Sequence, residues 1–148
     1  MATTWILAAD RAQARLYRLH GRGKPLSLIE QFEHPEGRAH EGDLVTDSGA
    51  AVMQSGGQGQ RRDTEPEVSA TEHEAQVFAG QLAQRLSRGR VERAFESLVL
   101  IAPPAFLGVL RKALDRDTRR CVKHEIDKNL LQYSDQKLGQ VISQTLYI

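Results

Sequence analysis

The stretch that decides the fold runs from Ser97 to Leu114 and reads SLVLIAPPAFLGVLRKAL. Residues 97–102 form a continuous apolar run, which is typical of a β-strand covered on both faces. Pro104 comes next, and proline is tolerated in the first turn of a helix. Apolar side chains then recur at helical spacing, at Phe106, Leu107, Leu110 and Leu114. The stretch predicts a central strand followed by a short helix.

Upstream of this unit the chain shows the patterns of further strands. Residues 5–9 are an apolar run closed by Asp10, and residues 15–19 alternate. Residues 26–32 resume the alternation with one irregularity, after a turn of composition HGRGKP. Because the connections are short, we expect these strands to form an antiparallel meander.

The remaining elements complete an α/β pattern. Ser69 and Thr71 each precede a glutamate by three residues, so either can open the capping box of a helix that ends near Gly89. Residues 121–126 read as a strand, and Ser134 begins a last helix. The order βββαβαβα predicts one mixed sheet of about five strands flanked by helices, of the ribonuclease H-like type.

Length and composition indicate an ordinary globular protein. The 148 residues fit one domain over 1–148, with 40% hydrophobic and 26% charged residues. The net charge of +1 gives no strong overall attraction to nucleic acid or membranes, so a basic binding face must be local. The N-terminal apolar run is too short for a signal peptide or a membrane span, which predicts a cytoplasmic protein without membrane insertion.

The segment from about residue 34 to 68 lacks the periodicity of a helix or strand. Gly, Asp, Glu, Ser, Gln and Arg dominate it. Loops of this length inside compact domains are uncommon and are usually functional or disordered. We therefore expect a long functional or flexible loop here.

Several landmarks in one order resemble the bacterial host-attachment protein family across nearly the whole chain. They are WILAADRAQARLY, HPEGRAHEGDLVTDSGA, TEHEAQVFAGQLAQRL, LVLIAPPAFLGVLRKAL and EIDKNLLQYS. The family name implies a requirement for attachment to host cells, which is a phenotype and names no chemistry. The family is also similar in fold to the middle domain of archaeal and eukaryotic peptide-chain release factors and Pelota.

The release-factor resemblance implies a role for Gly56, Gly57 and Gln58, which form a Gly-Gly-Gln triplet in the corresponding loop. In release factors such a tip hydrolyses the peptidyl-tRNA ester. Glycines let the backbone approach the ester, and the glutamine N–H can stabilise the oxyanion. Arg61 and Arg62 would bind nearby phosphates. The alternative is a flexible Gly- and Gln-rich loop without chemistry.

Two further readings involve metals. Asp10 ends the first strand, where ribonuclease H-like nucleases place a metal ligand, and Asp43, Asp47 or Asp127 would complete a set. The competing interpretation is that Asp10 caps the following turn. His34, His40 and His73 match no recognised ligand spacing, so we expect solvated histidines, no bound metal and no cofactor.

Basic residues are concentrated in two places, near the first hairpin and around the predicted short helix that carries Arg111 and Lys112. If RNA is a partner, Arg111 and Lys112 join Arg61 and Arg62 as phosphate-binding candidates. We expect a non-enzymatic interaction or regulatory module that supports attachment indirectly. The alternatives are a ribosome-associated factor that uses the triplet and a metal-dependent nuclease. The partner would be the ribosome and tRNA or an unidentified protein, and a homo-oligomer is compatible with the sequence.

Overall fold

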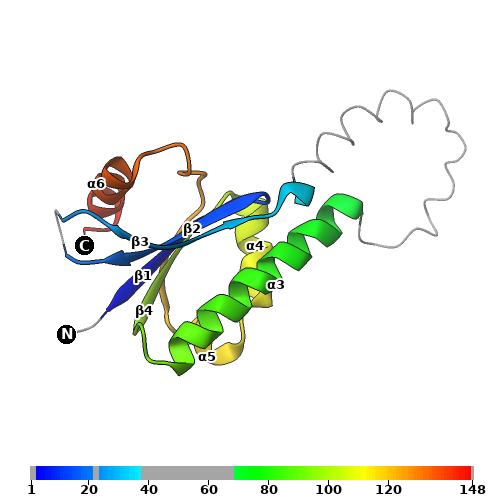
Figure 1. Ribbon diagram of the computed structural model, residues 1–148, viewed down its shortest axis with the longest axis horizontal. Helices are drawn as coiled ribbons and strands as arrows, with labels where there is room; N and C mark the ends of the chain where they lie inside the picture. The colour runs from blue at the N-terminus through cyan, green and yellow to red at the C-terminus, as the bar shows by residue number, and fades with distance from the viewer. Residues whose placement is uncertain (1–2, 22–23, 38–68, 148) are drawn as a thin grey trace, which may run out of the picture.

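A computed structural model describes residues 3–21, 24–37 and 69–147 of the chain. Within these ranges the elements follow one another as shown in Figure 1: β1 Thr4–Ala9, β2 Gln13–Leu19, β3 Ser27–Glu33, α3 Ala70–Val91, β4 Ser97–Ile101, α4 Pro104–Ala113, α5 Arg116–Arg120, β5 Val122–Ile126 and α6 Asp135–Leu146. The predicted order is confirmed, with α5 as an addition. This helix is short and polar, so it has no apolar periodicity to reveal it, and it begins where Asp115 accepts a hydrogen bond from the Thr118 N–H.

One mixed sheet organises the fold, with the strand order β3-β2-β1-β4-β5. Strand β1 pairs antiparallel with β2 and parallel with β4, and β4 pairs parallel with β5. The irregularity predicted near the third strand is a register shift opposite Leu16 and Tyr17 of β2. The α/β class and the ribonuclease H-like arrangement are therefore confirmed.

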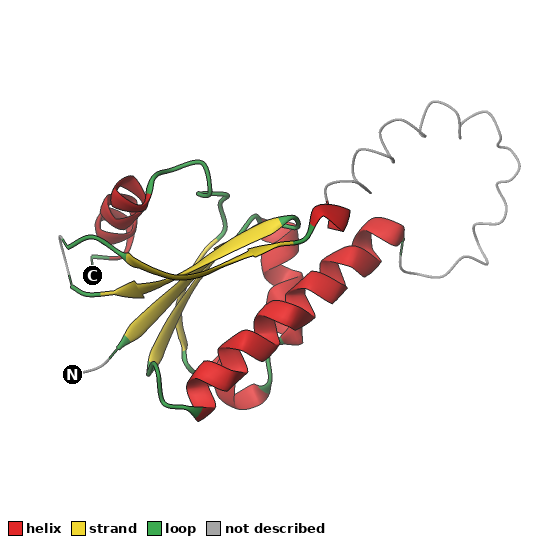
Figure 2. Ribbon diagram, viewed as in Figure 1, coloured by secondary structure: helices red, strands yellow, loops and turns green. Residues whose placement is uncertain are grey.

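Helices cover both faces of the sheet, as Figure 2 shows. Helices α3 and α4 pack on one face, where Leu98 and Leu100 of β4 are buried. Helix α6 packs on the other face, where Val99 and Ile101 of β4 are buried. The apolar run of β4 is thus explained, because its side chains alternate between two cores.

Helix α3 begins at the predicted capping box but ends later than expected. The Ser69 hydroxyl accepts a hydrogen bond from the Glu72 N–H, and Glu72 accepts one from the Ser69 N–H, each at 3.1 Å. Gly89 does not stop the helix: a Cβ there would lie 2.6 Å from the Trp5 ring, so this glycine serves close packing. The helix continues to Val91 and is followed by Arg93 in the left-handed conformation, with φ of 60°.

A partly buried polar network joins β2 to α6. Tyr17, which is fully buried, donates a hydrogen bond of 2.6 Å to Asp135 Oδ1. The Arg15 guanidinium donates to the backbone oxygens of Leu131 and Tyr133. Burial of Tyr17, together with its hydrogen bond to Asp135, raises the pKa of the phenol well above its usual value.

This raised pKa predicts alkaline sensitivity. The folded chain keeps the Tyr17 proton to a higher pH than the unfolded chain, so the contribution to stability is complete below about pH 10 and is lost above it. The loss is at most about 1.4 kcal/mol per pH unit, reduced by solvent screening at the partly exposed Asp135. Urea unfolding above about pH 10 should show that the free energy of unfolding falls more steeply with pH for wild type than for Tyr17→Phe. Equal slopes of the free energy of unfolding against pH for the two proteins would contradict this prediction.

Candidate functional site

The candidate site lies at the edge of the sheet where β1 and the two strands parallel to it end. Carboxyl ends of parallel strands meet at one edge, and open α/β sheets bind ligands there. Here Asp10 follows β1, Pro103 precedes α4 and Asn129 follows β5. They line a hollow of about 450 Å³, with Ala12 and Phe106 among the other lining residues.

The carboxylate of Asp10 organises the β1–β2 connection. Its Oδ1 accepts hydrogen bonds from the N–H groups of Ala12 at 2.8 Å and Gln13 at 2.9 Å. Its Oδ2 accepts a bond of 3.4 Å from the Asn129 side chain. The interpretation of Asp10 as a turn-capping residue is therefore confirmed.

The carboxylates proposed to join Asp10 at a metal are not assembled in the described ranges. Asp127 is exposed after β5, while Asp43 and Asp47 lie outside the described residues. Across residues 3–21, 24–37 and 69–147, no group of three or more His, Cys, Asp or Glu side chains is arranged to hold a metal ion.

Next to this hollow, His34 forms a contact that we call the clasp, made of His34, Glu74 and Phe78. His34 Nε2 lies 2.8 Å from Glu74 Oε1, and because a carboxylate only accepts, this nitrogen donates. The imidazole stacks on Phe78 with centroids 5.1 Å apart and an interplanar angle of 5°. His34 is only 7% exposed, so the expectation of a solvated histidine is wrong here. Its partners come from α3, and local sequence does not reveal them.

The backbone after β3 is fixed on the β1–β2 connection. The His34 N–H donates to the Ala12 carbonyl at 2.7 Å, and residues 35–37 form a helical turn. Gly37 packs so closely that a Cβ would overlap the Arg11 carbonyl oxygen and lie 2.9 Å from its carbon. The expected loop over 34–68 is thus corrected at its start: residues 34–37 are structured.

The clasp connects the described residues on either side of the segment 38–68. It joins the residue after β3 to the first turns of α3, and both the 35–37 turn and the start of α3 lie at the same end of the molecule in Figure 1. The described residues on either side of the segment 38–68 are therefore held close together. Gly56, Gly57, Gln58, Arg61, Arg62 and His40 lie outside the described residues.

The remaining candidates are distributed over α3 and α4. Arg111 donates two hydrogen bonds to Glu125 of β5, at 3.1 and 2.5 Å, and this pairing raises the pKa of the guanidinium. Lys112 lines a groove between α4 and α3 that includes Glu72. Arg111 and Lys112 thus contact different neighbours. His73 is exposed, as expected.

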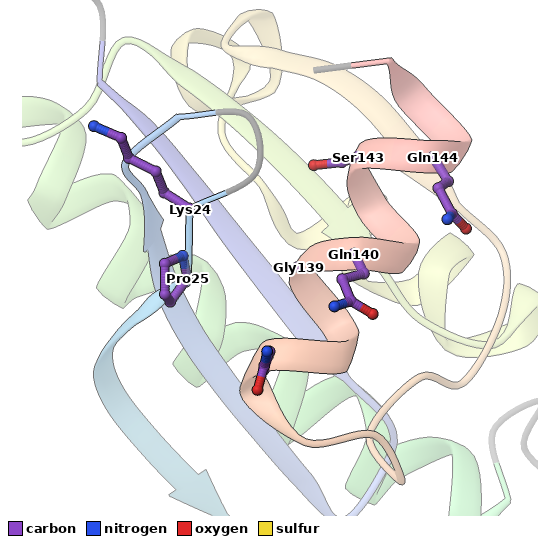
Figure 3. Close-up of a pocket in the computed structure, with 7 residues that line it drawn as sticks. Lys24, Pro25, Gly139, Gln140, Ser143 and Gln144 are labelled. Atoms are coloured by element: carbon purple, nitrogen blue, oxygen red, sulfur yellow. The ribbon is translucent and has the colours of Figure 1, made fainter.

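A second hollow lies between the β2–β3 connection and α6, as Figure 3 shows. It has a volume of about 300 Å³, with Lys24 and Pro25 on one side and Gly139, Gln140, Ser143 and Gln144 on the other. Lys24 is the titratable side chain among its described lining residues. A ligand in this hollow would therefore be bound mainly by hydrogen bonds to amide and hydroxyl groups. The periodicity of the sequence does not indicate the hollow.

None of the helices in the described ranges combines the length and the apolarity that crossing a bilayer requires.

Solved structures that are similar to the chain include the following two. One is described as an archaeal protein, with a TM-score of 0.46, 10% identity, and coverage of 98% of this chain and 38% of that one. The other is the archaeal translation termination factor aRF1, with a TM-score of 0.47, 10% identity, and coverage of 98% and 39%. The chain thus spans well under half the length of either protein.

Comparison with curated proteins gives no match. The family model described as "Protein required for attachment to host cells" matches residues 5–142, which include β2 to β5, all of β1 except its first residue, the clasp and most of α6. The chain therefore belongs to the family of proteins required for attachment to host cells.

Proposed function

We propose that the chain is a cytoplasmic, non-enzymatic binding module that presents residues 38–68 to a partner and supports attachment indirectly. The observation that carries the proposal is the clasp, which joins His34 to Glu74 and Phe78 at the base of this segment. A buried histidine held by a hydrogen bond and ring stacking gives the segment a fixed origin on the folded domain.

A fixed base favours binding through the segment for an entropic reason. Bringing the ends of a loop together costs conformational entropy, which the clasp and the β1–β2 contacts offset during folding. A partner that then binds residues 38–68 binds a segment whose flanking residues are already held together. Less of the interaction energy is consumed by ordering, so affinity rises.

The test is complementation of a strain that lacks the protein. Residues 38–68 are replaced by a Gly/Ser spacer of equal length, and attachment to host cells is counted. We expect the spacer variant to fold, as judged by circular dichroism, and to leave attachment at the level of the deletion strain. A matched variant, Lys128→Ala with Lys137→Ala, changes exposed side chains elsewhere and should restore attachment. Full restoration by the spacer variant would contradict the proposal.

A second candidate function is favoured by a specific observation: the Gly-Gly-Gln triplet at 56–58 lies, in sequence, between His34 and Glu74, which the clasp joins. In this proposal the protein acts on the ribosome, and a water molecule attacks the ester carbonyl of peptidyl-tRNA. The bond to the ribose oxygen breaks, and the water proton passes to that oxygen. Gly57 permits close approach, the Gln58 N–H stabilises the oxyanion, and Arg61 and Arg62 bind phosphates.

Peptide release from stalled ribosome complexes tests this second candidate. If the candidate is correct, wild type releases the peptide and Gly57→Ala with Gln58→Ala loses release by about 100-fold or more. A Cβ at position 57 hinders close approach to the ester, and the Gln58 side chain that can orient the attacking water is removed, while the backbone N–H of residue 58 remains. Release by neither protein, with attachment still dependent on residues 38–68, would exclude hydrolysis and leave the binding-module proposal in place.

A further inference from the structure

Positive charge is concentrated at the end of α3 opposite the clasp. Residues 85–123 contain ten of the chain's 20 basic residues and four of its 19 acidic residues. The structure brings together five exposed arginines there, which we call the arginine surface: Arg88 and Arg93 at the C-terminal end of α3, and Arg116, Arg119 and Arg120 on α5. In the sequence these arginines form two separate groups, at 88–93 and at 116–120, and only the fold places them together.

Contacts between α3 and α5 fix the arginine surface. The Arg90 Nε–H donates a hydrogen bond of 3.1 Å to Thr118 Oγ1, and Thr118 is fully buried. Asp115 accepts bonds from the Thr118 N–H and hydroxyl, which anchors the start of α5. Figure 1 shows α5 beside the C-terminal end of α3.

Stabilisation of helix ends explains why arginine occurs at some of these positions. Cations are favourable in the last turn of a helix, which is where Arg88, Arg119 and Arg120 lie. Arg116 instead occupies the first position of α5, where acidic residues are favoured.

Arg93 lies at a position where glycine is favoured. Its N–H donates to the Arg90 carbonyl and the Ala94 N–H donates to the Gly89 carbonyl, at 2.9 and 2.8 Å. This is a Schellman motif, and its left-handed residue, here Arg93 with φ of 60°, is usually glycine. A non-glycine side chain in this conformation costs stability, which makes Arg93 a candidate for a functional position.

The guanidinium groups are available to a ligand. Within the described part of the chain, Arg88, Arg93, Arg116 and Arg120 form no ion pair with an acidic side chain. Arg119 donates to the Leu114 carbonyl and also lines a hollow beside β5 that includes Lys123. Phosphate is the ligand that matches exposed guanidinium forks, because each fork can donate two parallel hydrogen bonds.

We propose that the arginine surface binds the phosphate backbone of RNA. A membrane surface fits less well, since Val91 is the one large apolar side chain exposed beside these arginines among the described residues. Helix α5 has five residues, too few to enter a DNA major groove as a reading element. Backbone contacts without base reading suit an RNA helix. This surface is distant from the clasp, so its test is independent of the proposed function.

Fluorescence anisotropy with a labelled RNA duplex tests the proposal, with the purified full chain titrated between about 50 and 200 mM salt. We expect Arg88→Gln with Arg116→Gln to bind about 100-fold more weakly at the lowest salt, with the salt slope reduced by about two. The matched control, Arg18→Gln with Lys137→Gln, removes equal charge from exposed positions elsewhere and should stay within about threefold of wild type. Equal losses in both variants, or no binding by wild type, would overturn the proposal.

A DNA duplex and vesicles with anionic lipid serve as competing ligands. RNA is expected to bind at least as tightly as DNA and more tightly than the vesicles. Preference for DNA, or for vesicles, would overturn the assignment to RNA.

Arg93→Gly separates a binding role from a structural one. Glycine suits the left-handed position, so the thermal midpoint should be no lower than that of wild type, while RNA affinity falls about tenfold at low salt. Unchanged affinity, or a loss of affinity that accompanies unfolding, would overturn the role assigned to Arg93.

Discussion

Replacement of Phe78 by alanine is expected to destabilise the folded chain by about 3–5 kcal/mol. Phe78 is 1% exposed and packs between the His34 ring of the clasp and Phe106 of α4, with ring centroids 5.1 and 6.0 Å away. Truncation removes buried apolar surface and leaves a cavity that helices α3 and α4 cannot fully close. Urea unfolding followed by circular dichroism gives the free energy directly.

The neighbouring Val77 provides a matched control for this prediction. It lies on the same helix but is 36% exposed, so Val77→Ala should change the free energy of unfolding by less than about 0.5 kcal/mol. Phe78→Leu keeps most of the volume and should cost much less than alanine. Similar stabilities for Phe78→Ala and Val77→Ala would show that Phe78 does not join the clasp to the core.

Gly37→Ala is expected to detach the 35–37 turn and to cost about 1–3 kcal/mol. The new Cβ would overlap the Arg11 carbonyl oxygen, which belongs to backbone and cannot rotate away as a side chain would. The contact of His34 with Ala12 would be strained at the same time. Amide hydrogen exchange should show faster exchange at His34 and Gly37 and little change in β4.

Gly80 is the control for a glycine-to-alanine change. It lies within α3, and a Cβ added there would meet nothing within 4 Å, so Gly80→Ala should stabilise the chain by up to about 1 kcal/mol. If Gly37→Ala also stabilised the chain, the close packing of the turn on the β1–β2 connection would be refuted.

Much of the fold could be predicted because its signals are local. The apolar run of β4, the capping box at Ser69 and the proline at the start of α4 each depend on residues near one another in sequence. The capping role of Asp10 is also predictable from the sequence, since a side chain that accepts hydrogen bonds from the N–H groups two and three positions later acts locally.

The features that the sequence does not predict depend on contacts between distant parts of the chain. His34 was expected to be solvated, yet its partner Glu74 lies on a helix 40 positions later. Gly89 was expected to end α3, but it is required under Trp5 of β1. The arginine surface likewise needs α3 and α5 to be placed together. Gly56 to Gln58, with Arg61 and Arg62, lie outside the described residues, so their roles stay predictions.

Attachment by a deletion strain that carries Glu74→Ala or Glu74→Gln tests most directly whether the protein acts through a segment held by the clasp. Alanine removes the acceptor of the His34 hydrogen bond, whereas glutamine keeps an acceptor oxygen at the same place. Both proteins should fold. We expect Glu74→Ala to leave attachment close to the level of the deletion strain and Glu74→Gln to restore it. Full attachment with Glu74→Ala would contradict the claim that the protein acts through a segment held by the clasp.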